Sequence, residues 1–147
     1  DLADLAAAAA DSLARRFEAA GITLDRRLAA SPVLADPHWL HQVITNLLTN
    51  ALKFTPAGGH VTIATRRSGA EAVLQVTDTG SGIPADDLPR IFDRFWRGQQ
   101  AAQVSGSGIG LAVAAELAQA HGGRLTARSE SEGPGRGTEI TLTLPGA

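Results

Sequence analysis

Apolar side chains recur at helical spacing over one long segment in the first half of the chain. They return every three or four positions and form one broad arc, made of Leu40, Val43, Ile44, Leu47, Leu48, Ala51 and Phe54. Asp36 and Pro37 stand just before this segment, and a capping carboxylate followed by a proline in the first turn is a typical helix start. The pattern predicts an amphipathic central helix that ends at residues 56–59.

Two further helices are predicted, one on each side of this segment in the chain. Residues 2–20 are rich in alanine, a strong helix former, and Gly21 ends the run. We expect this first helix either to dock on the domain or to continue from a partner segment. A glycine-rich stretch at 105–110 opens the third helix, which runs to about His121. Such a start offers free backbone N–H groups and a positive dipole end to phosphate.

Residues with alternating polarity predict short strands between and after these helices. The expected strands are 22–28, 33–35, 60–67, 72–77, 124–129 and 138–144. In the last strand the apolar residues and Thr138 share one face, and polar residues occupy the other. A strand that is polar on one side implies a sheet covered by helices on one face only. The predicted fold is therefore a two-layer α/β (α+β) sandwich with an open, mixed or antiparallel sheet.

Three polar side chains lie beside the apolar arc of the central helix. Asn46 and Asn50 are four residues apart and Lys53 follows three later, so all three fall on one narrow stripe. An amide oxygen is a neutral ligand for Mg2+, and an ammonium suits phosphate. Lys53 is also the only lysine in the chain. The stripe indicates either the wall of a phosphate and magnesium pocket or three solvated residues on a surface helix.

A carboxylate is predicted at the buried side of a strand end. Asp78 continues the core-side positions of strand 72–77, and a charge there must find donors from the protein or from a ligand. Thr138 has the same core-side position, so the two side chains are expected to meet beneath a ligand. Gly80 and Gly82 follow and allow close approach of the backbone to a ligand, a plain turn being the alternative.

Length and composition narrow the function classes. The 147 residues suit one domain with one core. The net charge of -2 and the lack of a basic run give no indication of nucleic-acid binding. The chain contains no cysteine, which excludes disulfides and thiolate chemistry, and no apolar run long enough to span a bilayer. We expect a cytoplasmic domain that contacts neither nucleic acid nor the membrane directly.

The order of the motifs is more specific than any one of them. The chain carries Asn-x-x-x-Asn-x-x-Lys from Asn46, Asp-x-Gly-x-Gly-Ile from Asp78, Phe-x-x-Phe from Phe92 and Gly-x-Gly-x-Gly-Leu from Gly106. This series closely resembles the N, G1, F and G2 boxes of the catalytic and ATP-binding domain of bacterial sensor histidine kinases. The closing Gly-Thr-Glu-Ile-Thr-Leu-Thr-Leu-Pro is similar to the terminal strand of that family. The resemblance runs from about residue 22 to 145.

The resemblance implies the Bergerat α/β sandwich, with a mixed, mostly antiparallel sheet and helices on one face. Residues 1–20 would form a linker helix or the tail of a dimerisation hairpin absent from this chain. Residues 21–147 would form the ATP-binding catalytic domain, with an ATP lid at about 92–108.

The resemblance also implies a role for each site residue. Asp78 would accept a hydrogen bond from the exocyclic amine of adenine, and Thr138 would join it through an ordered water. Asn50 would coordinate Mg2+, with Asn46 beside the metal and phosphates and Lys53 on phosphate. Related ATPases place a glutamate base where Asn46 stands, and an asparagine fits phosphoryl transfer with little hydrolysis. The other implied nucleotide-binding residues are Gly80, Gly82, Ile83, Phe92, Phe95, Gly106, Gly108, Gly110 and Leu111, and Arg94 or Arg97 would reach the phosphates.

The implied activity is that of a protein-histidine kinase using ATP and Mg2+. The γ-phosphoryl would pass to a histidine on the dimerisation and histidine-phosphotransfer hairpin of the same kinase, with a response regulator downstream. The domain is expected in the cytoplasm, with a parent protein that is either free or anchored in the membrane. The four histidines of this chain, His38, His41, His60 and His121, lack the acceptor context. The alternatives are a serine kinase of the anti-sigma type and a non-catalytic, nucleotide-gated binding module.

Overall fold

The computed structural model describes residues 1–80, 110–130 and 137–146. These residues form three α-helices and five β-strands. In chain order they are α1 (Leu2–Ala19), β1 (Thr23–Leu28), α2 (Pro37–Phe54), β2 (His60–Ser68), β3 (Glu71–Asp78), α3 (Gly110–Ala120), β4 (Arg124–Glu130) and β5 (Gly137–Pro145). None of the helices in these ranges is both long and apolar enough to cross a membrane.

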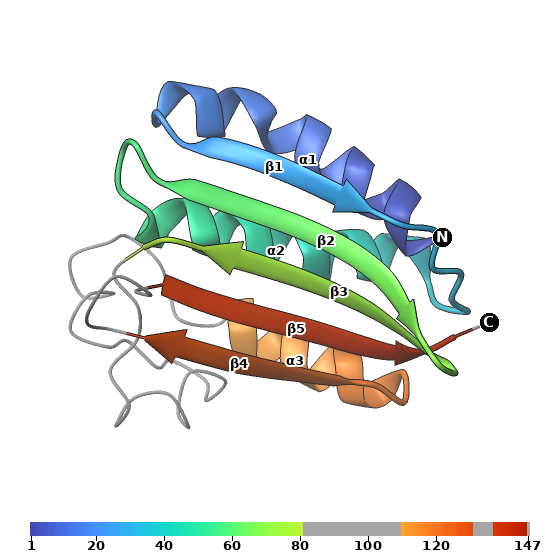
Figure 1. Cartoon of the computed structure of the whole chain (residues 1–147). Helices are drawn as coiled ribbons and strands as arrows, with labels where there is room; N and C mark the ends of the chain where they lie inside the picture. Colours follow the sequence, from blue (N-terminus) through green and yellow to red (C-terminus); the bar gives the residue numbers. More distant parts are fainter. Residues whose placement is uncertain (81–109, 131–136, 147) are drawn as a thin grey trace.

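The five strands form one sheet in the order β1-β2-β3-β5-β4. β1 runs parallel to β2, and the other neighbouring pairs are antiparallel. All three helices lie on the same face of this sheet (Figure 1). The predicted two-layer sandwich, with a mixed, mostly antiparallel sheet and helices on one face, is therefore confirmed.

The central helix has the predicted apolar face. Its arc is buried from Leu40 to Ala51, and only Phe54, in the last turn, is half-buried. The Asp36 carboxylate caps the helix by accepting from the backbone N–H of His38 at 2.9 Å. Trp39 adds a buried ring that stacks on His121 with a centroid separation of 3.8 Å. This stack joins the start of α2 to the end of α3.

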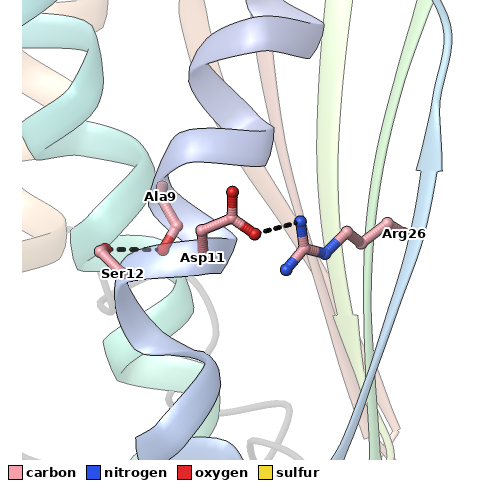
Figure 2. Close-up of polar contacts among 4 residues, drawn as sticks. All are labelled: Ala9, Asp11, Ser12 and Arg26. Carbon is pink, nitrogen blue, oxygen red and sulfur yellow. Dashed lines mark hydrogen bonds and ion pairs between the residues drawn. The ribbon is translucent and has the colours of Figure 1, made fainter.

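The first helix is docked on the sandwich. Its buried residues are Leu2, Ala6, Ala9, Ala10, Leu13 and Phe17, and all but Ala10 belong to the main core cluster. On the side towards β1, the Asp11 carboxylate lies 2.7 Å from the guanidinium of Arg26 (Figure 2). The hydroxyl of Ser12 donates locally to the carbonyl of Ala9 at 2.8 Å (Figure 2). The structure thus shows this helix packed against the rest of the domain.

One predicted strand is wrong. Residues 33–35 form no ladder, and Val33 makes only an isolated bridge with Gly146. Pro32 supplies no backbone N–H, and the cap of α2 at Asp36 follows closely, so too few residues remain for a strand. Leu34, next to Val33, is 88% exposed, as expected of a connecting segment.

Candidate functional site

The predicted carboxylate lies at one end of the sheet. Asp78, the last residue of β3, is paired directly with Thr138 near the start of β5. Each residue is 8% exposed. The two side chains are on the helix-covered side of the sheet, as the alternation of residues along β3 and β5 predicts.

Backbone donors hold the carboxylate in place. Oδ1 of Asp78 accepts from the N–H of Gly80 at 2.9 Å, and the backbone N–H of Thr138 donates to the same carboxyl group. Burial raises the pKa of Asp78 above its ordinary value of 3.8, while the two hydrogen bonds act in the opposite direction. A carboxylate has about four lone-pair positions, so two donors leave capacity to accept from a ligand.

Two glycines permit the close packing around Asp78. A Cβ on Gly80 would lie 2.3 Å from the carbonyl oxygen of Phe54, at the end of α2. A Cβ on Gly137 would lie 2.0 Å from the carbonyl oxygen of Asp78 itself, and the φ of Gly137 is +148°. Any larger residue at either position would push the strand end away from its neighbour. The need for glycine at position 80 therefore has a structural cause, in addition to the expected approach of the backbone to a ligand.

A pair of hydroxyl groups lies beside the carboxylate. Ser129 of β4 is the direct strand partner of Thr138, and their side-chain oxygens are 2.9 Å apart. The Ser129 hydroxyl also donates to the carbonyl of Gly137 at 2.8 Å. Sequence reasoning missed Ser129 and Gly137. The available signal was the alternation of β4, which puts Ser129 on the same side as the buried Leu125.

The polar stripe of α2 has the exposure expected at the edge of a core. Asn46 and Asn50 are half-buried, and Lys53 is exposed. The carboxyl end of α2 lies at the same end of the sheet as the carboxyl end of β3 (Figure 1). Lys53 directly precedes Phe54, whose carbonyl oxygen faces Gly80, so α2 and β3 supply polar groups to one end of the molecule.

The other predicted site residues are outside the described part of the chain or have no described side chain. Gly82, Ile83, Phe92, Arg94, Phe95, Arg97, Gly106, Gly108 and the predicted lid at 92–108 lie outside the described residues. Gly110 is the first residue of α3, and Leu111 follows it. The described site is thus formed by α2, the end of β3, and the facing ends of β4 and β5.

The sheet, its helices and the buried carboxylate together are typical of one group of nucleotide-binding domains. A mixed sheet with helices on one face, and a buried carboxylate followed by a closely packed glycine, are expected of a Bergerat-type nucleotide-binding domain. Residues 35–147 match the family of histidine kinase-, DNA gyrase B-, and HSP90-like ATPases, and the chain belongs to this family.

Similar sequences within the family are sensor histidine kinases. The chain is 44% identical over 114 residues to the sensor histidine kinase WalK of Bacillus subtilis. The aligned region covers 75% of this chain and 18% of WalK. It is 44% identical over 112 residues to the adaptive-response sensory kinase SasA of Synechococcus elongatus, covering 76% of this chain and 28% of SasA. The chain thus spans less than a third of the length of these relatives.

Solved structures agree with the sequence comparison. A mycobacterial sensor histidine kinase, MprB, superposes with a TM-score of 0.91 at 30% identity, covering 99% of this chain and 96% of that one. Full-length ShkA in complex with AMPPNP superposes with a TM-score of 0.86 at 31% identity, covering 100% of this chain and 30% of that one. The resemblance to the catalytic, ATP-binding domain of sensor histidine kinases is confirmed.

Proposed function

We propose that this domain transfers the γ-phosphoryl group of Mg-ATP to a histidine on a dimerisation and phosphotransfer hairpin. A response regulator would then take the phosphoryl group from that histidine. The observation that carries the proposal is the buried Asp78 carboxylate, which keeps unused acceptor capacity in a chain of this ATPase family.

Asp78 is proposed to select the adenine ring. A buried charge is costly unless it is fully hydrogen-bonded, and an exocyclic amine supplies the donor that the two backbone N–H groups leave room for. Thr138, paired with Asp78 across the strands, would hold an ordered water beside the same ring. Gly80, and Gly82 with Ile83 beyond the described residues, would bring the backbone alongside the base.

The stripe on α2 is proposed to hold the metal and the phosphates. The half-buried Asn50 offers a neutral amide oxygen to Mg2+, which takes its remaining ligands from phosphates and water. When bound, the ion neutralises charge on the transferred group. Lys53 would pair with phosphate, and Asn46 would lie beside the metal without acting as a base. These residues would act by positioning and by charge, since the partner supplies the nucleophile.

The lid and the domain boundaries complete the proposal. Phe92 and Phe95 would anchor a lid over about 92–108, Arg94 or Arg97 would reach the phosphates, and the glycines from Gly106 to Gly110 with Leu111 would form its far end. Residues 1–20 remain a proposed linker or hairpin tail, and the burial of α1 favours a linker helix docked on the ATP-binding unit of 21–147.

The adenine contact is tested by the substitution Asp78→Ala. Loss of a hydrogen bond to a charged group costs about 1.5–3 kcal/mol, which lowers ATP affinity by about ten- to a hundredfold. Titration calorimetry on the folded variant measures the loss. Asp25→Ala, at an exposed strand position, is the matched control and should bind ATP as the wild type does. Wild-type affinity in Asp78→Ala would refute the assignment.

The metal contact is tested by Asn50→Ala in the same assay. The variant should lose most of the increase in ATP affinity that Mg2+ gives, and should keep its affinity for adenosine. Gln42→Ala removes an exposed amide from the same helix and serves as the control. If Asn50→Ala keeps the full magnesium effect, Asn46 replaces Asn50 as the proposed ligand.

A further inference from the structure

The hydroxyl pair beside Asp78 has a defined hydrogen-bond direction. The Ser129 hydroxyl lies 2.8 Å from the carbonyl oxygen of Gly137 and 2.9 Å from the hydroxyl oxygen of Thr138. A carbonyl oxygen only accepts, and a serine hydroxyl has one proton to donate. The Ser129 proton therefore points to Gly137, and Thr138 must be the donor in the contact between the two hydroxyls.

This direction decides what Thr138 can offer to a ligand. Its proton is directed to Ser129, so its oxygen presents only lone pairs towards the side of the sheet that it shares with Asp78. The ionised carboxylate of Asp78 is also an acceptor only. Two neighbouring acceptors, each 8% exposed, thus lie at the end of the sheet.

We propose that Ser129 is a positioning residue that makes this site select an amino-substituted purine over a keto-substituted one, a role that rests on the proposed function. An exocyclic amine, or a water held by it, can donate to both Asp78 and Thr138. A carbonyl oxygen at the same place would face two acceptors and leave buried polar groups without partners. Without Ser129, the Thr138 hydroxyl can turn and donate to that carbonyl.

The test compares the binding of ATP with that of inosine triphosphate, which carries a carbonyl oxygen where ATP carries the exocyclic amine. The measured quantity is the ratio of the two Kd values in the presence of Mg2+. Ser129→Ala should lower the preference for ATP by about two- to tenfold, the effect of one neutral hydrogen bond. Ser129→Thr keeps a hydroxyl and should restore the preference. Ser12→Ala is the matched control. It removes a hydroxyl that also donates to a carbonyl, on α1 and far in sequence from Ser129 (Figure 2).

A double-substitution cycle separates this role from a general loss of structure. In a Thr138→Val background, Ser129→Ala should change the ratio no further, because Ser129 acts only through the Thr138 hydroxyl. An equal change in both backgrounds overturns the role. Ser129→Cys fills a similar volume with a weak acceptor and replaces the alanine variant if that variant does not fold; its ratio should fall as well.

Different results would show that the role of Ser129 fails and that the proposed function fails. A wild-type domain that binds neither nucleotide overturns both. A wild-type domain that prefers ATP, together with a folded Ser129→Ala or Ser129→Cys variant of unchanged preference, overturns the role of Ser129 alone.

Discussion

At the scale of single residues, burial of the Asp78 carboxylate lowers the stability of the fold, while the same carboxylate is proposed to bind adenine. Its carboxylate is 8% exposed and has two backbone donors, and burial still raises its pKa above 3.8. A raised pKa means that the folded state binds the proton more tightly than the unfolded state does. The charge that would bind adenine therefore destabilises the empty domain at neutral pH.

The cost of this charge predicts a pH-dependent effect of Asp78→Asn. In the wild type, the contribution of Asp78 to stability is fully present below the ordinary pKa of 3.8 and is lost as the pH rises through the raised folded-state pKa. The asparagine variant exchanges no proton, so its free energy of unfolding should rise relative to the wild type over that window. Urea denaturation at a series of pH values measures the difference. A difference that stays constant, or that falls as the pH rises, would contradict the assignment of the raised pKa.

Gly80 shows what sequence reasoning missed at this scale. The two glycines after Asp78 indicate close approach of the backbone, and a ligand is the obvious neighbour to expect. In the structure the neighbour of Gly80 is the carbonyl oxygen of Phe54, 2.3 Å from where a Cβ would lie. The need for glycine could be predicted from the sequence, because it reflects local backbone freedom. The partner could not, since it is 26 residues earlier in the chain, at the end of another element.

At the scale of elements, both the conformation and the packing of α2 can be predicted from its sequence. For α1, only the helical conformation can be predicted. The arc, the cap at Asp36 and the polar stripe of α2 are all local patterns, and the structure contains each of them. Residues 2–20 also predict a helix, but alanine-rich sequence leaves open what the helix packs against. The structure buries Phe17 at 1% exposure within the common core.

The packing of α1 predicts a large effect of Phe17→Ala. Removal of a fully buried aromatic ring leaves a cavity and costs about 3–5 kcal/mol in the free energy of unfolding. Leu34→Ala, at a position that is 88% exposed, should change it by less than about 0.5 kcal/mol. Chemical denaturation measures both values. A loss below about 1 kcal/mol for Phe17→Ala would mean that α1 is not part of the cooperative unit.

At the scale of the whole molecule, the histidines bear on the proposed reaction. His38 and His41 lie in the first turns of α2, and His60 is the first residue of β2. His121 stacks on Trp39, and its Nδ1 lies 3.0 Å from the carbonyl oxygen of Leu117. Each lies near the end of an element, and none is followed by an acidic residue in the sequence.

These positions predict that the chain binds ATP without phosphorylating itself. Incubation with γ-labelled ATP should leave this chain unlabelled, and addition of a cognate histidine-bearing hairpin should give acid-labile label on the hairpin. Acid-stable label would indicate the serine kinase alternative, and no label at all would indicate the binding module. Stoichiometric acid-labile label on this chain alone would contradict the proposal and point to one of its four histidines.

Most helices and strands, the two-layer arrangement and the family could be predicted from the sequence alone. These features rest on the spacing of apolar residues, on glycine and proline, and on the order of short motifs, all of which act locally along the chain. The strand predicted at residues 33–35 was wrong, because a proline and a nearby helix cap leave no room for it.

Which distant residues meet at the site could be seen only in the folded molecule. The pairing of Ser129 with Thr138, the contact of Gly80 with Phe54 and the docking of α1 all depend on strand order and register. The direction of a single proton between two hydroxyls follows from a third partner, the carbonyl of Gly137. Such contacts are decided by the packing of the elements against one another, because hydrogen bonds require separations of about 3 Å that no local pattern specifies.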